Sequence, residues 1–345
     1  MRLVCTRGTD CGSFTAPRAG LSAAGVINWA VYNSMGRVLT VFAHGDADGV
    51  CSAAVVVAAL AGEYEEVEVY FTHPVDLLKD FREFARGDVY IVDVAIDEKA
   101  AEEAGRVFAG YGGRVVYVDH HPLSADLPRV EVVHEVGSSA SELAYRLLGG
   151  RLPKSYSRVA LYGAISDYMD HTPWVREALE AWDRRIIYFE AGVLMQGLER
   201  ARKDHDFKRE VVRHLAKNLP PSAMARLMKM AEEQARVNEE LVWWVERNVS
   251  LRGSVALVVN PPGPLGLAAN LARGLAGAEV GVAAEARGDM YVVSLRSRGL
   301  DLNAFLRDFA RRYGVSGGGH PNAAGARIPR DLLPVLVEEL SRLRR

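Results

Sequence analysis

The sequence has few cysteines, no marked excess of charge of either sign, and no apolar run long enough to cross a membrane. Its three cysteines cannot build a disulfide framework, so we expect a reducing, cytoplasmic location. The 42 Lys and Arg residues nearly balance the 44 Asp and Glu residues, and the net charge of −2 argues against a protein that wraps long duplex DNA. The uncharged run Gly49–Gly62 is shorter than the roughly 20 residues of a membrane span, so we expect no membrane partner.

What remains is an ordinary globular composition, with 49% hydrophobic and 25% charged residues. A chain of 345 residues with that composition can form two domains, and it contains no internal repeat or low-complexity tract. Residues 1–36 are interpreted as an N-terminal extension. Its uncharged stretch Ala19–Gly36 is broken by polar residues and lacks a convincing small-residue cleavage site, so we do not expect a secretory signal.

Short apolar segments alternate with longer helical segments from Arg37 onward. Each predicted strand is rich in β-branched residues, and the segments between them carry apolar residues at helical spacing. The predicted strands are Val38–Ala43, Val67–Phe71, Val89–Val94 and Val115–Val118, and the predicted helices are Ser52–Leu60, Val75–Arg86 and Glu98–Ala109. This order predicts an α/β domain with a parallel sheet, in which ligands collect at the carboxyl ends of the strands.

The chain changes character after residue 197. Residues 198–250 are helical and rich in charge, with Pro220-Pro221 in the middle, and are interpreted as a helical connector. A smaller α/β unit follows, with predicted strands Val255–Asn260, Val280–Ala284 and Met290–Ser297, predicted helices Leu267–Leu275 and Leu302–Tyr313, and a final helix from Arg330. We therefore assign domains to residues 37–197 and 251–345, joined by the connector.

The first chemical motif, HGDADG at 44–49, directly follows the strand Val38–Ala43. His44, Asp46 and Asp48 alternate along the chain and leave the strand end together, while Gly49 permits a tight turn into the next helix. Carboxylates with an imidazole suit Mn²⁺ or a similar divalent cation. An acidic turn with an N-capping aspartate is the alternative, but two aspartates and a histidine within five residues favour a metal site.

Further acidic and imidazole groups follow the other strands. Asp93 ends the apolar strand Val89–Val94, where an acidic side chain is costly unless it is paired or bound to metal. Asp119, His120 and His121 come directly after Val115–Val118. Adjacent histidines point in different directions, so one can bind a metal while the other faces substrate, and Asp119 can orient an imidazole.

Other aspartates are ambiguous from their context. Asp97 is interpreted as a helix cap. Asp167 follows the apolar stretch Val159–Ile165, where an ordinary helix-end aspartate fits as well as a metal ligand. Asp170 and His171 are neighbouring candidates for the same role.

The second domain contains a glycine-rich motif, GGGHPNAAG at 317–325. Consecutive glycines let backbone N–H groups converge on an anion, although a flexible turn is the usual reading of such a run. Just upstream, two arginines alternate on a predicted strand and share one face, which favours phosphate or carboxylate recognition over a solvated strand edge once the glycines are considered. The substrate-binding candidates of this domain are Arg296, Arg298, Gly317, Gly318, Gly319 and His320.

Together these segments resemble the DHH phosphoesterase superfamily. The motifs occur in the family's order: HGDADG at 44–49, VDVA at 92–95, VDHHP at 118–122, SDY at 166–168 and GGGHPNAAGA at 317–326. The last resembles the DHHA1 domain, the C-terminal substrate-binding domain of the family. The HxDxDG form is similar to the archaeal RecJ-like branch. The superfamily also includes oligoribonucleases of the nano-RNase type, cyclic-dinucleotide phosphodiesterases and pyrophosphate hydrolases.

The resemblance implies a site for two divalent cations, Mn²⁺ in the first place, with Mg²⁺ or Co²⁺ as alternatives. One ion would have His44 and Asp46 as ligands, and Asp93 would bridge it to a second ion, whose other ligands would be Asp48, His120 and Asp167. His121 would face the phosphate of the substrate, and Asp119 would support the histidine pair. The residues with implied catalytic roles are therefore Asp93, Asp119, His120 and His121.

The implied chemistry is hydrolysis of a phosphodiester by a metal-bound water, without a covalent enzyme intermediate. The near-neutral charge favours short oligonucleotides, because each phosphate contact normally recruits Lys or Arg. We therefore predict an Mn²⁺-dependent, exonuclease-like phosphodiesterase that acts on short single-stranded RNA or DNA. A cyclic-dinucleotide or small phosphoanhydride hydrolase is the alternative among enzymes. A partner-bound scaffold in a replication or repair complex is the alternative of another class.

The connector carries a basic cluster that could extend a nucleic-acid track. Acidic residues lie among its members, so pairing on the helix surface is an equal alternative. The cluster consists of Arg200, Arg202, Lys203, Lys208, Arg209 and Arg213.

Overall fold

The structure, a computed structural model, describes residues 37–343. The predicted N-terminal extension over residues 1–36 lies outside this range, as do Cys5 and Cys11. Cys51 is a buried free thiol. Within the described range, no helix combines the length and the apolar character that a membrane span requires.

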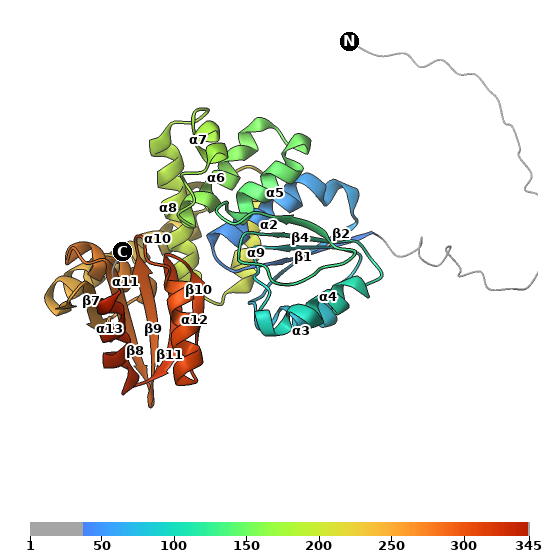
Figure 1. The fold of residues 1–345 in the computed structure, drawn as a ribbon. Helices are drawn as coiled ribbons and strands as arrows, with labels where there is room; N and C mark the ends of the chain where they lie inside the picture. Colours follow the sequence, from blue (N-terminus) through green and yellow to red (C-terminus); the bar gives the residue numbers. More distant parts are fainter. Residues whose placement is uncertain (1–36, 344–345) are drawn as a thin grey trace, which may run out of the picture. The chain divides into compact units, whose positions relative to one another are not determined.

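Five parallel strands form the sheet of the first domain, in the order β2-β1-β3-β4-β5 (Figure 1). All four predicted strands are present, as β1 (Val38–Ala43), β2 (Glu66–Phe71), β3 (Asp88–Val92) and β4 (Val115–Asp119). The sequence pattern does not predict β5 (Glu131–His134), because its two apolar residues are too few to show a period. The predicted parallel-sheet α/β architecture is confirmed.

Helices cover both faces of this sheet, as Figure 1 shows. Strand residues alternate between two cores, with Phe42 and Ile91 facing one and Val41 and Val92 facing the other, as the two-residue period of a strand requires. The first core is closed by α3 (Leu77–Phe84) and α4 (Ala101–Ala109). The second is closed by α2 (Ala47–Leu60), α5 (Ala140–Leu148), α6 (Ser157–Ser166), α7 (Pro173–Leu179), α8 (Arg184–Ala201) and α9 (His205–Ala216).

The strand order reverses between β1 and β3. These strands pair directly, although β2 separates them in the sequence. In open α/β sheets, ligands bind outside the carboxyl ends of the strands at such a switch point. His44 and Asp46 follow β1 and Asp93 follows β3, so the topology itself brings the first two chemical motifs together.

The segment predicted as a connector folds as the end of α8, α9 and α10 (Ala225–Asn248). α9 packs within the first domain, and α10 continues into the second. Leu227 and Ala231 of α10 belong to a core of the first domain, whereas Leu241 and Val245 belong to a core of the second. The predicted boundary at residue 197 therefore falls inside α8, and the helix that joins the two cores is α10.

The second domain is built on a six-stranded mixed sheet, in the order β10-β11-β9-β8-β7-β6. Its strands are β6 (Ser250–Arg252), β7 (Val255–Val259), β8 (Val280–Arg287), β9 (Met290–Ser297), β10 (Ser316–His320) and β11 (Ala323–Pro329). One face packs against α10 and α11 (Leu265–Leu275), and the other against α12 (Leu302–Tyr313) and α13 (Leu332–Arg342). This smaller α/β domain is the one that the sequence predicts.

The glycine motif adopts a different conformation from the predicted one. It forms β10, an edge strand paired antiparallel with β11, and not an anion-binding nest. In an extended strand successive residues face opposite sides, so the N–H groups of Gly317, Gly318 and Gly319 cannot converge on one anion. The prediction of a nest is wrong because two residues of turn, Pro321 and Asn322, are enough to fold the glycine run back onto β11 as a hairpin.

Candidate metal centre and active site

The HGDADG motif carries the chain from β1 into α2, which begins at Ala47, five residues before the predicted start. Asp46 is the N-cap of this helix: its Oδ1 accepts a hydrogen bond from the Gly49 N–H at 3.1 Å. Its Oδ2 lies 2.7 Å from Nδ1 of His44. One carboxylate therefore caps the helix and also faces the imidazole, so the two interpretations of the motif do not exclude each other.

Asp48 lies in the first turn of α2 and is only 2% exposed. Its two oxygens accept hydrogen bonds from the first N–H groups of α5, at 2.7 Å from Ala140 N and 3.0 Å from Ser141 N. Burial raises the pKa of Asp48, although the charge of His120 and the Ser141 N–H favour its ionised form. The side chain thus joins two helices at the site and retains free lone pairs.

The close approach of α6 to Asp48 requires glycine at position 163. A Cβ at Gly163 would lie 2.6 Å from Oδ1 of Asp48 and 2.8 Å from Cβ of Ser141. We predict that Gly163→Ala lowers the free energy of unfolding by about 1–3 kcal/mol, the usual cost of overpacking. Urea unfolding measures the change. Gly192→Ala in α8, where a Cβ meets nothing within 4 Å, is the control, and equal stabilities of the two variants would contradict the prediction.

Asp93 is the most constrained carboxylate of the site. β3 ends at Val92, two residues before the predicted end at Val94, and Asp93 adopts a left-handed conformation with φ 58°. The side chain is 3% exposed; its Oδ1 lies 3.3 Å from Nε2 of His120, and its Oδ2 lies 3.9 Å from Nδ1 of His44. No hydrogen bond reaches Oδ2 from any described residue. A buried carboxylate oxygen without a partner is costly, and a divalent cation would satisfy it.

Asp119 orients the neighbouring histidine. Asp119 is fully buried and accepts hydrogen bonds from the Tyr117 hydroxyl at 2.8 Å, the His121 N–H at 3.2 Å and Nδ1 of His121 at 2.9 Å. Burial alone would raise the pKa of Asp119, but His121 and Tyr117 lower it, and Asp119 in turn raises the pKa of His121. The carboxylate therefore fixes the ring of His121 and leaves Nε2 available.

Asp167 follows the end of α6 and lies near His120. Its Oδ2 is 3.4 Å from Nε2 of His120, which places the ambiguous aspartate inside the cluster. Its competitor Asp170 instead accepts a hydrogen bond from the Tyr188 hydroxyl at 2.7 Å. The neighbouring Tyr168 has φ 60°, so the chain turns sharply directly after Asp167.

All six predicted metal ligands come together in two sets. Within each set, one ligand atom per residue lies within 4.8 Å of the others. One set is His44, Asp46 and Asp93, and the other is Asp48, His120 and Asp167; a third, overlapping set of Asp93, His120 and His121 connects the two. The unpartnered Oδ2 of Asp93 and the mixture of carboxylate and imidazole donors fit a pair of divalent cations such as Mn²⁺.

Burial and crowding favour the protonated forms of Asp167 and Asp93. Burial, reinforced by Asp48 and Asp46, raises the pKa of Asp167 to about 8. Burial and the charges of Asp46 and Asp48 raise the pKa of Asp93 well above its ordinary range. A cation must therefore displace protons to bind at neutral pH.

This protonation predicts pH-dependent metal affinity. Between pH 6 and 8 we expect the dissociation constant for Mn²⁺ to fall by about tenfold per pH unit for each proton displaced. The metal-free protein should lose stability as pH rises from about 4 to about 8, because folded Asp167 keeps a proton that the unfolded chain has released. Calorimetric titration with Mn²⁺ in buffers of different ionisation enthalpy measures the released protons. An affinity that is constant over this pH range would contradict the prediction.

The second domain contributes His320 to this site. Its ring centroid lies 4.8 Å from that of His121 and 5.8 Å from that of His120. Burial and the two neighbouring histidines lower the pKa of His320 to about 4, so the ring is neutral at pH 7. Among the glycines before it, Gly319 donates its N–H to Oδ1 of Asn303 in α12 at 3.0 Å.

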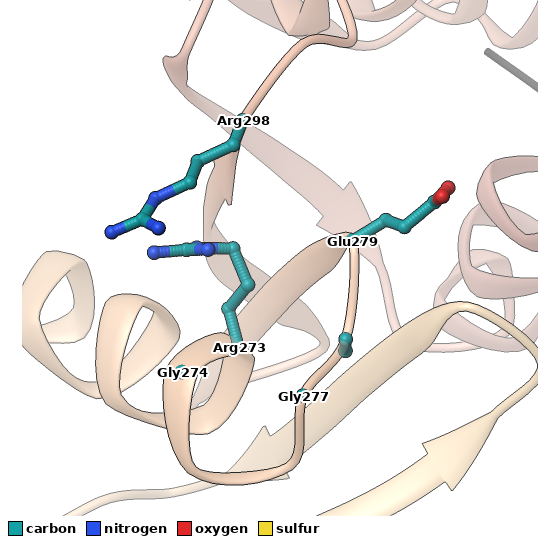
Figure 2. Close-up of a pocket in the computed structure, with 6 residues that line it drawn as sticks. Arg273, Gly274, Gly277, Glu279 and Arg298 are labelled. Atoms are coloured by element: carbon teal, nitrogen blue, oxygen red, sulfur yellow. The ribbon is translucent and has the colours of Figure 1, made fainter.

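The two predicted arginines lie in different surroundings. Arg296 is partly buried, and its Nη1 donates to Ser294 Oγ at 3.0 Å and Leu295 O at 2.9 Å. No carboxylate of the described residues forms an ion pair with Arg296. β9 ends at Ser297, so Arg298 lies just beyond the strand, where its guanidinium is beside that of Arg273 (Figure 2).

Sequence reasoning misses two residues of the site. Lys208 in α9 is buried, and its Nζ donates a hydrogen bond to the backbone oxygen of Gly45. His73 follows β2, and its ring lies 5.5 Å from that of His44. The sequence contains a sign of each. Lys208 is in helical register with the apolar residues Val211 and Leu215, which predicts that it faces the core. His73 follows a strand whose carboxyl end lies at the same edge of the sheet.

Three of the six residues of the basic cluster in the predicted connector are paired or engaged. Arg209 pairs with Asp206 at 2.6 Å, and Arg200 pairs with Glu233 at 3.3 Å. Lys208 is turned into the core beside Gly45. These contacts favour the pairing alternative over a continuous nucleic-acid track.

The structure is an α/β protein whose acidic and imidazole groups gather at the switch point of the parallel sheet, where they could hold divalent cations. Residues 38–168 match the model of the DHH family, N-terminal domain, and residues 255–344 match that of the DHHA1 domain. The chain belongs to the DHH family of phosphoesterases, whose members are metal-dependent hydrolases. No curated protein sequence matches it.

Solved structures with the same fold include RecJ in complex with Mn²⁺ from Thermus thermophilus, at 20% identity and a TM-score of 0.66. The match covers 90% of this chain and 53% of that RecJ, so the chain spans about half its length. The pGpG-specific phosphodiesterase PggH from Vibrio cholerae matches at 13% identity and TM-score 0.58, over 88% of this chain and 97% of PggH. CDC45 from Entamoeba histolytica matches at 10% identity and TM-score 0.55, over 91% of this chain and 98% of that protein.

Proposed function

We propose that this protein is a Mn²⁺-dependent phosphodiesterase that removes nucleotides from one end of short single-stranded RNA or DNA. The observation that carries the proposal is the buried carboxylate of Asp93, whose Oδ1 faces His120 of one ligand set and whose Oδ2, which accepts no hydrogen bond from a described residue, faces His44 of the other. A scaffold without a catalytic role would have no need for these crowded carboxylates, which destabilise a fold that holds no cation. The RecJ likeness supports a nuclease, and the PggH likeness supports a substrate with few phosphates.

The two sets of ligands would hold a pair of cations, which when bound would activate a water molecule and neutralise the phosphate. The chain's own groups complete the site. Because Nδ1 of His121 is fixed by Asp119, its Nε2 can hold a proton against a phosphate oxygen or the leaving oxygen. Lys208 holds the backbone at Gly45 and places a positive charge near Asp46.

The opposite side of the site would bind the substrate strand. No carboxylate of the described residues pairs with Arg296, so its guanidinium can donate to an anionic phosphate. His320, which is neutral beside His121, can donate a second hydrogen bond to the same phosphate. The ion pairs of Arg200 and Arg209 interrupt the basic cluster, which supports a short substrate over a continuous track for a long strand.

A substrate panel tests the proposed function. RNA and DNA of two to ten nucleotides, labelled at either end, would be compared with cyclic dinucleotides and pyrophosphate, each with Mn²⁺ and with EDTA. We expect Mn²⁺-dependent release of mononucleotides from one end, fastest with the shorter strands. Turnover of pyrophosphate or cyclic dinucleotides alone would replace this proposal with the corresponding hydrolase, and no turnover of any substrate would favour the scaffold.

Arg296→Ala is expected to raise KM for a short oligonucleotide by about tenfold while kcat changes by less than threefold, because the lost guanidinium binds a phosphate that does not react. Arg327→Ala, an exposed arginine of the same sheet, is the matched control. Steady-state kinetics with saturating Mn²⁺ measures both constants. An unchanged KM, or a loss confined to kcat, would remove Arg296 from the binding surface.

A further inference from the structure

Two arginines of the second domain lie together, and no carboxylate of the described residues forms an ion pair with either. Arg273 is in the last turn of α11, and Arg298 follows the end of β9. Figure 2 shows their guanidinium groups side by side, with the carboxylate of Glu279 directed away from both. They line a surface depression together with Gly274, Gly277, Ala278 and Glu279.

The hydrogen bonding of this arginine pair is incomplete. Nη2 of Arg273 donates to Oδ1 of Asn270 at 3.1 Å, but its Nε is buried and no described residue accepts from it. Among the residues that the structure describes, none forms a hydrogen bond or ion pair with the guanidinium of Arg298. Two like charges and an unused buried donor are costly together, and an anion would satisfy both.

A purely structural role accounts for only one of the two residues. An arginine in the last turn of a helix interacts favourably with the helix dipole, which explains Arg273 at the end of α11. The same argument offers nothing for Arg298, which lies beyond the strand and adds a second positive charge at the same place. The stability of the fold therefore does not explain why two arginines lie side by side here, and a bound anion would.

The position of the pair relates it to the candidate active site. Arg296 lies on the face of β9 that meets α11, and Arg298 follows two residues later, directly after the strand ends. α11 packs along that face: Gly266 in its first turn lies against Nη2 of Arg296, and its last turn carries Arg273. Two cationic points thus lie in sequence along one side of the domain, and the first is electrostatically coupled to His320.

We propose that Arg273 and Arg298 form a second phosphate subsite, which binds a backbone phosphate of the strand beyond the nucleotide held by Arg296 and His320. The inference rests on the proposed function, and it adds a determinant of substrate length. Paired guanidinium groups offer several N–H donors to one phosphodiester, the geometry in which arginine binds phosphate best. Because these contacts reach only the backbone, the subsite would sense the length of the strand and not its sequence.

Binding without turnover tests the subsite. Fluorescence anisotropy in EDTA would give dissociation constants for end-labelled single strands of two, three, five and seven nucleotides. The readout is the dissociation constant of the dinucleotide divided by that of the pentanucleotide. Repulsion from the metal-free carboxylates weakens the binding of both strands, so it largely cancels in this ratio. In the double variant Arg273→Ala/Arg298→Ala we expect this ratio to fall about tenfold. The slope of log affinity against log salt for the pentanucleotide should decrease in magnitude by about 0.7 for the lost phosphate contact.

Controls separate the subsite from general charge effects. Arg287→Ala removes an exposed arginine at the other end of the β8–β9 hairpin and should leave the ratio unchanged. Arg298→Lys, which keeps the positive charge, should give a ratio between those of the wild type and the double variant. A double variant with the wild-type ratio, or with equal losses for all lengths, overturns the proposal. AMP is the last control. If AMP binds the wild type more tightly than the pentanucleotide does, and does not bind the double variant, the arginine pair is a site for free nucleotide and the proposal is overturned.

The outcome is independent of the test of the proposed function. If the substrate panel gives no turnover but the double variant loses its length dependence, the phosphate subsite stands and the hydrolase proposal fails. If oligonucleotides are hydrolysed and the ratio does not change, the hydrolase proposal stands and the subsite fails.

Discussion

Asp93→Asn is expected to lower kcat/KM for an oligonucleotide by at least about 10³-fold, roughly 4 kcal/mol of transition-state stabilisation. The carboxylate of Asp93 faces both ligand sets, with Oδ1 3.3 Å from Nε2 of His120 and Oδ2 3.9 Å from Nδ1 of His44. Asparagine fills the same space but carries no charge, so the variant should also lose most of its affinity for Mn²⁺. Kinetics across a range of Mn²⁺ concentrations measures both effects.

The same variant should not unfold the protein. In the metal-free state burial and its acidic neighbours raise the pKa of Asp93 well above its ordinary range, which favours the uncharged side chain. Its midpoint of thermal unfolding in EDTA should therefore equal or exceed that of the wild type, whereas the stabilisation by added Mn²⁺ should disappear. Asp97→Asn, four residues along the same loop, is the control and should behave as wild type, since asparagine can still accept from the Lys99 N–H. Retained activity in Asp93→Asn would remove Asp93 from the site.

Asp48→Ala is expected to abolish hydrolysis and, unlike Asp93→Asn, to lower the free energy of unfolding by about 2–3 kcal/mol even without metal. The reason is that both oxygens of Asp48 accept backbone hydrogen bonds, from Ala140 N and Ser141 N, which alanine leaves buried without an acceptor. Urea unfolding in EDTA measures the loss. Asp48 should thus contribute to the free energy of unfolding of the metal-free protein, whereas Asp93 should not.

Asp48→Asn provides the graded control for this prediction. Its single carbonyl oxygen can accept one of the two N–H groups, so its stability should fall between those of the wild type and Asp48→Ala. A stability of Asp48→Ala equal to that of the wild type in EDTA would show that α5 does not depend on this carboxylate.

The parts of the site that the sequence predicts are those that depend on strand ends. His44, Asp46 and Asp93 each follow an apolar run rich in β-branched residues, and parallel strands have their carboxyl ends at the same edge. Such local signals place these side chains at one edge of the sheet, and the pairing of β1 with β3 then brings them together. Asp167 is different, because nothing in its own segment separates a ligand from a helix-end aspartate, and only the packing of α6 against Asp48 brings it to the cluster.

The parts that the sequence does not predict depend on contacts between distant segments. Lys208 reaches Gly45 because α9 packs on α2, and Arg273 meets Arg298 because α11 lies across β8 and β9.

The prediction for the glycine motif is wrong for a different reason. Glycine permits both a nest and a strand, and the neighbour β11, not the glycine itself, decides between them.

The most direct test of the account is the number of divalent cations that one chain binds. Electron paramagnetic resonance during titration of the metal-free protein with Mn²⁺ reports both the stoichiometry and the magnetic coupling of neighbouring ions. We expect two Mn²⁺ ions per chain with the spectrum of a coupled pair, and at most one uncoupled ion in Asp93→Asn. A wild-type protein that binds one isolated ion or none would contradict the proposal that these carboxylates and histidines form a two-cation hydrolytic site.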